Sequence, residues 1–156
     1  MKKYILSFVI LLISTSLSLA EQKHWENTIT IKFMHINTKI TFGMDVLATD
    51  GFDFQYDVPY FGSSTLTSYF ITEDGKMFKD IRSMNNHAIF SLKIENNDTN
   101  NESLKLMWKP EKFPQNFEIY LTDPLTNDKI DMKAHSIYRF PNTKIRYLDI
   151  EVTKKD

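Results

Sequence analysis

Apolar and polar side chains alternate along most of the chain after residue 28. Residues 28–33 and 40–42 show the alternation most clearly, and the turn-prone segment 37–39 separates them. A period of two places every second side chain on one face of an extended strand. Residues 28–43 are therefore predicted to form a β-hairpin. Its inward-facing side chains would be Ile29, Ile31, Phe33, Ile40 and Phe42.

The same spacing recurs in seven further short runs. They cover residues 66–71, 90–94, 104–108, 117–121, 130–132, 137–140 and 148–152. Turn-forming residues separate the runs, and helical spacing is sustained nowhere. About nine short strands predict an all-β fold, in which two antiparallel sheets pack as an immunoglobulin-like sandwich of about 7–9 strands. Trp108 shares the inward phase of its run and is expected in the core.

The first twenty residues differ from the rest of the chain. Lys2 and Lys3 precede an apolar stretch, residues 5–13, and Ser18–Ala20 then supplies small side chains where a signal peptidase cleaves. The apolar stretch is shorter than the ~20 residues that span a bilayer. We expect a cleavable signal peptide, residues 1–20, followed by one sandwich domain, residues 21–156. The mature protein is expected to be secreted or periplasmic, with no membrane insertion after cleavage.

Composition excludes several classes of function. The chain has no cysteine, so disulfides, thiolate zinc sites and cysteine nucleophiles are absent. Without residues 1–20, it carries 17 basic and 20 acidic residues, a formal charge of −3, which does not favour nucleic acid or an anionic bilayer. Its four histidines are scattered singly, and no nucleophile elbow or phosphate loop occurs. We predict no catalytic residues and no enzymatic activity.

Residues 42–59 form an acidic segment that is too irregular for a strand and too apolar for a flexible linker. It holds four carboxylates, Asp45, Asp50, Asp53 and Asp57. Carboxylate oxygens suit calcium, which takes six to eight ligands, although the spacing departs from that of an EF-hand loop. Aspartate is also the common partner of backbone N–H groups in turns. We therefore expect a structural role for these aspartates, with a calcium site as the alternative.

Aromatic residues and one arginine are the candidate ligand contacts. Tyr56 lies near the end of the acidic segment, and Tyr60 and Phe61 follow it. If these rings are exposed, they would stack on a sugar or a partner; if they are buried, they would belong to the core. Asp80 and Arg82 point the same way on an extended segment. Arg82 is expected either to clamp one of the loop aspartates or to recognise a ligand carboxylate or sugar.

Several segments together carry a family resemblance. They are the acidic segment 42–59, then 79–82 (Lys-Asp-Ile-Arg), 105–108 (Lys-Leu-Met-Trp), 119–123 (Ile-Tyr-Leu-Thr-Asp) and 130–132 (Ile-Asp-Met). Their order over residues 40–152 resembles immunoglobulin-like or fibronectin-III-like modules of secreted and cell-surface microbial proteins. One departure is residues 60–64, Tyr-Phe-Gly-Ser-Ser, where those modules often have a proline-rich run.

The resemblance implies a sandwich without catalytic residues. We therefore expect an exported binding or structural module that serves adhesion, surface assembly or an accessory role, with a protein or glycan partner at the cell exterior. The alternative is a calcium-dependent carbohydrate-binding module, in which the four aspartates hold the ion and Tyr56, Tyr60 and Phe61 contact the sugar.

Overall fold

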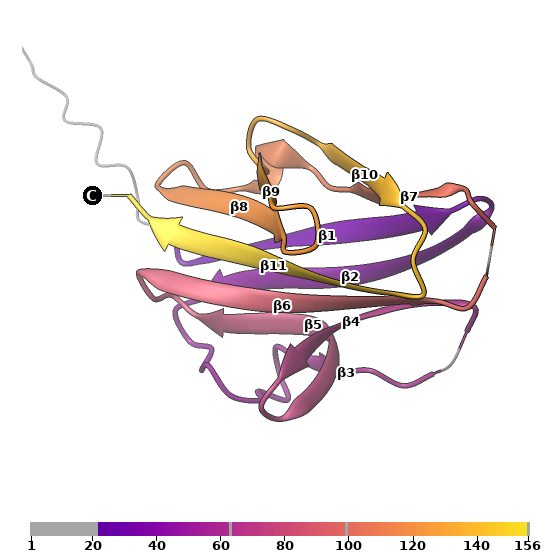
Figure 1. Ribbon diagram of the computed structural model, residues 1–156. Helices are drawn as coiled ribbons and strands as arrows, with labels where there is room; N and C mark the ends of the chain where they lie inside the picture. Colours follow the sequence, from indigo (N-terminus) through magenta and orange to yellow (C-terminus); the bar gives the residue numbers. More distant parts are fainter. Residues whose placement is uncertain (1–21, 63, 99, 156) are drawn as a thin grey trace, which may run out of the picture.

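The computed structural model describes residues 22–62, 64–98 and 100–155, so the expected signal peptide lies outside the described residues. Eleven strands and one short 3₁₀ helix make up the fold (Figure 1). They are β1 (His24–Phe33), β2 (Ile36–Asp45), β3 (Val58–Pro59), β4 (Leu66–Thr72), β5 (Gly75–Ser83), β6 (His87–Asn96), β7 (Ser103–Met107), η1 (Pro110–Lys112), β8 (Phe117–Asp123), β9 (Asp128–Asp131), β10 (Ile137–Pro141) and β11 (Ile145–Lys154). In these ranges, no helix has the length and apolar character to cross a bilayer.

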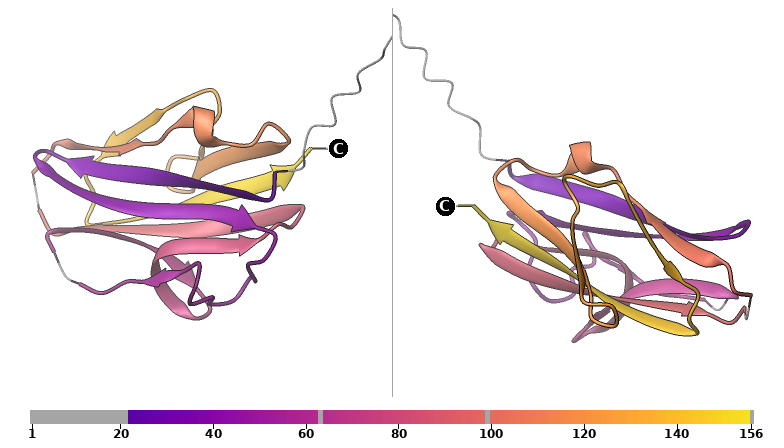
Figure 2. Two further views of the ribbon diagram at one scale, coloured as in Figure 1. Left: turned by 180° about the vertical axis from the view of Figure 1, so that it is seen from behind. Right: turned by 45° about the horizontal axis from the view of Figure 1, so that its top comes forward.

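All eleven strands belong to one sheet. Ten of them follow the order β10-β7-β1-β2-β5-β4-β6-β11-β8-β9, and β3 pairs with β5. Every pairing is antiparallel except that of β2 with β5, which is parallel. The sheet curls until β11 and β8 lie in front of β1 and β2, and the views from behind and from above show the same nearly closed, barrel-like form (Figures 1 and 2).

The predicted immunoglobulin-like, antiparallel two-sheet sandwich of 7–9 strands is wrong, because the fold is a single mixed sheet of eleven strands. Alternation with a period of two shows only that one face of each strand is buried. A sandwich and a curled sheet both satisfy it. The parallel pairing of β2 with β5 distinguishes the curled sheet from a sandwich. It joins two groups of antiparallel strands that would otherwise have formed separate sheets.

Strand β5 is the bridging strand, and the sequence pattern missed it. Its side chains are not cleanly alternating, because Met77, Asp80 and Ile81 are all buried, the last two as neighbours. Three strands pair with it along its edges, namely β2, β3 and β4. Both β3 and β5 were absent from the nine predicted strands, so the strand count was wrong for the same reason as the topology.

The core lies between the inward faces of the curled sheet. The predicted hairpin is confirmed as β1 and β2, whose strands pair from His24 opposite Asp45 to Phe33 opposite Ile36. Its turn is the two residues Met34 and His35, rather than segment 37–39. Met34 has a φ of 50°, which closes this tight turn.

Aromatic rings fill the middle of the core. Phe42 lies 5.7 Å from Trp25 and 5.2 Å from Phe90, ring centre to ring centre, in edge-to-face arrangements. Trp108 is buried as expected, and its indole N–H donates to the carbonyl of Met132 at 2.8 Å. Gly43 permits the close approach of β1 to β2, because a Cβ there would lie 2.1 Å from the Trp25 carbonyl oxygen.

Candidate binding site

The connection from β2 to the end of β3 exposes an unusual amount of apolar surface. We call residues 46–61 the aromatic loop; it runs through the lower part of the molecule in Figure 1, beside the β4–β5 hairpin. Six of the twelve exposed large apolar side chains in the described part of the chain belong to it. They are Val46, Leu47, Phe52, Phe54, Val58 and Phe61, of which Phe54 is 90% and Phe61 79% exposed.

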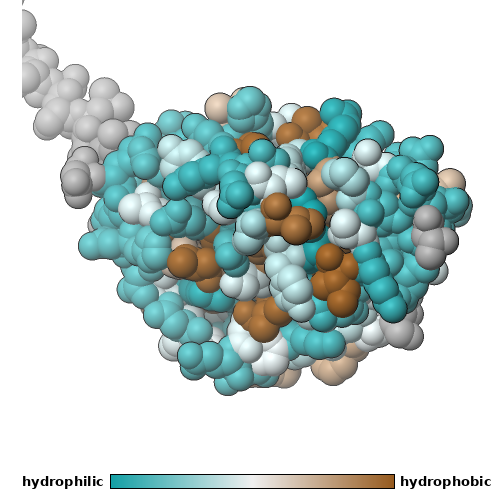
Figure 3. All heavy atoms as spheres, viewed as in Figure 1, coloured by the Kyte–Doolittle hydropathy of each residue, from teal (hydrophilic) through white to brown (hydrophobic). Residues whose placement is uncertain are grey.

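The other six exposed large apolar side chains of the described residues are spread over several elements, although Leu125, Ile145 and Tyr147 line one hollow of about 320 Å³. The face that carries β6 and β11 shows apolar residues as separate spots between hydrophilic ones (Figure 3). Single exposed apolar residues of this kind are normal on soluble proteins, whereas a concentration of them marks an interaction surface. The aromatic loop is therefore the first candidate for a functional site.

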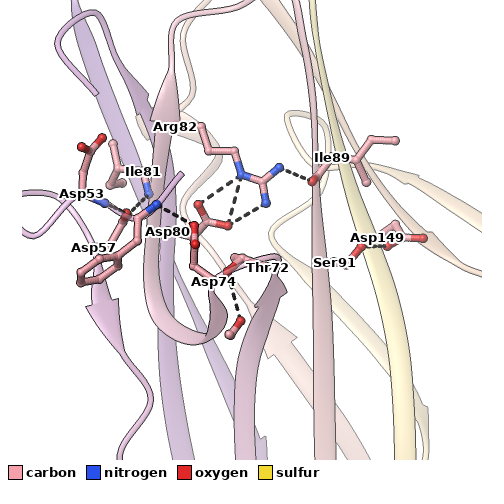
Figure 4. Close-up of polar contacts among 12 residues, drawn as sticks. Asp53, Asp57, Thr72, Asp74, Asp80, Ile81, Arg82, Ile89, Ser91 and Asp149 are labelled. Atoms are coloured by element: carbon pink, nitrogen blue, oxygen red, sulfur yellow. Dashed lines mark hydrogen bonds and ion pairs between the residues drawn. The ribbon is translucent and has the colours of Figure 1, made fainter. Parts of the chain in front are cut away.

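Asp57 fixes the aromatic loop to the bridging strand. One of its carboxylate oxygens accepts the backbone N–H of Ile81 in β5 at 2.9 Å, and the other accepts the backbone N–H of Asp53 at 2.7 Å (Figure 4). Burial raises the pKa of the Asp57 carboxyl, and the charges of Asp80 and Asp53 add to the rise, while the two backbone bonds oppose it. The side chain is only 8% exposed, so its hydrogen bonds are sheltered from water.

The other aspartates of the segment also bind protein groups. Asp53 accepts the backbone N–H of Thr49, and Asp45 accepts that of Leu47 at 2.7 Å. The second oxygen of Asp45 lies 2.9 Å from the His24 ring. Each carboxylate thereby stabilises a turn of the loop, which is the structural role expected as the alternative to calcium.

Two further carboxylates hold the loop at its middle. Asp50 accepts the Ser83 hydroxyl at 2.5 Å and the Asn85 side-chain amide at 2.9 Å. Asp74, in the β4–β5 turn, accepts the backbone N–H of Phe52 at 2.8 Å. The loop carboxylates thus bind donors of the protein, and most of the large apolar side chains of the loop are exposed.

In the described residues, no group of three or more histidine, aspartate or glutamate side chains is placed to hold a metal ion. That part of the chain therefore contains no assembled calcium site. Asp45, Asp50, Asp53 and Asp57 each bind separate protein donors. Calcium binding remains a sequence-based prediction, and a melting experiment below tests it.

The three aromatic candidates do not form one platform. Tyr60 packs its ring against Tyr69 and Phe78, at 5.0 and 4.7 Å between centres. The hydroxyl of Tyr56 has a raised pKa, chiefly because of desolvation and also because of the charges of Asp45 and Asp53. Of the three, Phe61 alone is largely exposed.

Arg82 is held by its own strand and the next. Its guanidinium binds the Asp80 carboxylate through Nε, at 3.2 Å from each oxygen, and through Nη2 at 2.8 Å. Nη1 donates to the carbonyl of Ile89 in β6 at 2.7 Å, and Figure 4 shows the side chain reaching across to that strand. The guanidinium also lies 4.5 Å from the centre of the Phe90 ring. The expected clamp therefore exists, but its partner is Asp80 instead of a loop aspartate.

A cleft adjoins the aromatic loop. It encloses about 660 Å³ between Arg82, the β4–β5 turn and the first residues of β6. A second hollow, of about 520 Å³, lies on the other side of Asp74 and is lined by Phe52 and Tyr60 among others. The exposed loop side chains and the two hollows make one irregular surface, of the kind that accepts a partner's projecting side chains.

A comparison with models of protein families, with curated proteins and with solved structures found no match for the chain in any of the three. The resemblance to secreted microbial modules therefore rests on the residues alone.

Sequence reasoning weighed calcium binding by the aspartates of this segment against a structural role, and among the most exposed residues it named only Phe61. Leu47, Phe52 and Phe54 were not among the candidates. The available signal was Phe52-Asp53-Phe54, in which a polar residue alternates with two aromatic ones. Asp53 accepts the backbone N–H of Thr49, and the neighbouring rings of Phe52 and Phe54 are 41% and 90% exposed.

Proposed function

We propose that the protein is an exported binding module without enzymatic activity, and that the aromatic loop docks it onto a protein partner at the cell exterior. The observation that carries this proposal is the inverted arrangement of the loop. Its carboxylates bind backbone and side-chain donors of the protein itself, whereas Leu47, Phe54 and Phe61 are each more than three-quarters exposed. An adhesion, surface-assembly or accessory role is consistent with such a surface.

Preorganisation of the loop backbone favours binding. Aromatic side chains that are already displayed in one conformation lose little conformational freedom on binding, and buried aromatic anchors supply most of the affinity of protein interfaces. Here Asp57, Asp53 and Asp74 hold the backbone on both sides of Phe54. The exposed rings are thus presented on a held backbone.

A protein partner fits this surface better than a sugar does. Sugar sites combine a flat ring with polar groups that bind hydroxyls, but the loop aspartates already have protein donors. The exposed set also includes aliphatic Val46, Leu47 and Val58, which suit an apolar protein surface.

The test is capture of partners from the exterior fraction of cells that make the protein, with wild type and a Phe54→Ser/Phe61→Ser variant as baits. Loss of the same discrete partner from the variant is expected. The control is Leu125→Ser, which removes an apolar side chain that is 67% exposed in the β8–β9 turn. Equal capture by all three baits, or binding of the wild type to glycans alone on an array, would contradict the proposal.

A further inference from the structure

A second surface, on the outer side of β10, β7, β1 and β2, gathers positive charge. Strand register places Lys32 of β1 directly opposite Lys105 of β7, and Lys105 directly opposite Arg139 of β10. Side chains in such pairs have Cβ atoms about 5 Å apart. The flanking residues Ile31, Leu106 and Tyr138 are buried, so the three cations point outward together. We call the following set the cationic face: Lys32, Lys39, Lys105, Lys109, Lys112 and Arg139.

These six cations have no acidic partner in the described part of the chain, where every ion pair involves other basic residues. Lys79, Lys93 and Lys129, on other parts of the sheet, each pair with a glutamate. Glu26 is the acidic residue of β1, and it is already bound by Lys79 at 2.6 Å. Like charges directly opposite one another destabilise a sheet. A row of three cations therefore favours the binding of an external anion.

The cationic face is hollowed at one end. A hollow of about 420 Å³ is lined by eight residues, among them Lys39, Lys109 and Lys112, and none of the eight is acidic. Thr28 and Thr30 add hydroxyl groups to its floor. Asn27, which is buried, fixes the backbone of Lys109 by donating to its carbonyl at 2.7 Å. The hollow and the row of three cations together form one elongated positive surface.

We infer that the cationic face binds an acidic polysaccharide, whose carboxylate or sulfate groups supply the missing counter-charges. Lysine ammonium groups are point charges that suit spaced anions without demanding bidentate geometry. A polymer chain fits an elongated, hollowed surface and meets several cations at once. The formal charge of −3 for residues 21–156 is thus compatible with anion binding, because the positive charge is local.

Other polyanions fit the surface less well. Single-stranded nucleic acid needs exposed rings on which bases stack, and the one aromatic residue that lines the hollow, Trp108, is 5% exposed. A bilayer is flat, whereas this surface is hollowed, and the half-buried Met107 and Ile137 offer little to insert into lipid. The inference does not rest on the aromatic loop, which lies on a different part of the sheet (Figure 2).

Titration of the purified protein with four probes tests the inference: heparin, polygalacturonate, single-stranded DNA and vesicles of phosphatidylcholine with phosphatidylglycerol. The variant is Lys32→Gln/Lys105→Gln/Arg139→Gln. The matched control, Lys23→Gln/Lys144→Gln/Lys155→Gln, changes the net charge equally at exposed positions outside the cationic face. Thermal melts confirm that both variants fold.

Wild type is expected to bind at least one polysaccharide more tightly than DNA or vesicles, and less tightly as salt rises. Loss of three exposed charge contacts is expected to raise the Kd about tenfold in the variant and to leave the control within about twofold. Equal weakening in both variants, no binding to either polysaccharide, or tighter binding to DNA or vesicles would overturn the inference. Heparin and polygalacturonate distinguish sulfate from carboxylate as the recognised group.

Discussion

Asp57 accepts the backbone N–H of Ile81 at 2.9 Å, and this bond connects the aromatic loop to the strand that joins the two groups of antiparallel strands. One buried side chain therefore serves both the fold and the candidate binding surface. Its other oxygen organises the loop through the N–H of Asp53.

Replacement of Asp57 by alanine is expected to destabilise the protein by about 2 kcal/mol, because two sheltered backbone donors lose their acceptor. Faster hydrogen exchange at residues 52–58 and weaker partner binding should follow. Urea unfolding and exchange mass spectrometry measure these effects. The control is Asp50→Ala, whose exposed bonds to side chains should cost under about 1 kcal/mol. Equal effects of the two replacements would argue against the role of Asp57.

Asp57 should also leave a mark on the pH dependence of stability. Its pKa is raised above 3.8 in the folded protein, chiefly by burial. The folded state therefore binds the proton more tightly than the unfolded state does, and the stabilisation present at low pH is lost as pH rises from about 3.8 through the raised pKa. The stability of wild type relative to Asp57→Asn should fall over this window and then level off. Urea unfolding at several pH values measures it; a flat or rising difference would contradict the assignment.

Calcium removal should leave the protein unchanged. Asp45, Asp50, Asp53 and Asp57 bind protein donors, and an ion bound only by the native state would raise the melting temperature by mass action. Thermal melts with EDTA and with excess calcium are expected to coincide. A rise of several degrees with calcium would restore the calcium site predicted from the sequence.

A buried ion pair stabilises the other end of the core. Arg146 and Asp123 are 3% and 1% exposed, and the Arg146 Nε donates to Asp123 at 2.9 Å. Burial raises the pKa of Tyr138 to about 12, so its hydroxyl stays protonated and donates to the same carboxylate at 2.9 Å. Arg146→Met should cost about 3 kcal/mol by leaving a buried charge unpaired.

Restoring an apolar interior should reverse that loss. The double variant Arg146→Met/Asp123→Leu is expected to regain most of the stability, because neither charge remains to be desolvated. Lys129→Gln, which removes an exposed partner of Glu151, serves as the control and should change stability by under about 1 kcal/mol. Urea unfolding measures all three, and a double variant no more stable than the single one would contradict this reasoning.

The sequence predicted strands well where one face alone is buried. The runs that became β1, β6, β7, β8 and β11 alternate plainly, and their inward apolar members lie in the core. β4 was also predicted, although Leu66 to Phe70 are all buried and Ile71 is exposed. Those strands fix the all-β class. The topology depends on β5, which the sequence did not predict. Its adjacent residues Asp80 and Ile81 are both buried, so its burial does not follow a period of two.

The candidate site overlaps the segment that the sequence singled out. Residues 42–59 were noted as unusual, and the roles within them were assigned by residue type. For the aspartates, both a structural role and calcium binding were considered. Asp53 and Asp57 take the structural role, because they accept backbone N–H groups, whereas the exposed Phe54 was not a candidate.

The central claim, that the aromatic loop is a docking surface for a protein, is tested most directly by photo-crosslinking in cells that make the protein. A benzophenone side chain at position 54 is compared with one at position 125, which is similarly exposed but distant in the chain. We predict a crosslinked protein of discrete mass from position 54 and none from position 125. The same products from both positions, or no product from position 54, would contradict the account.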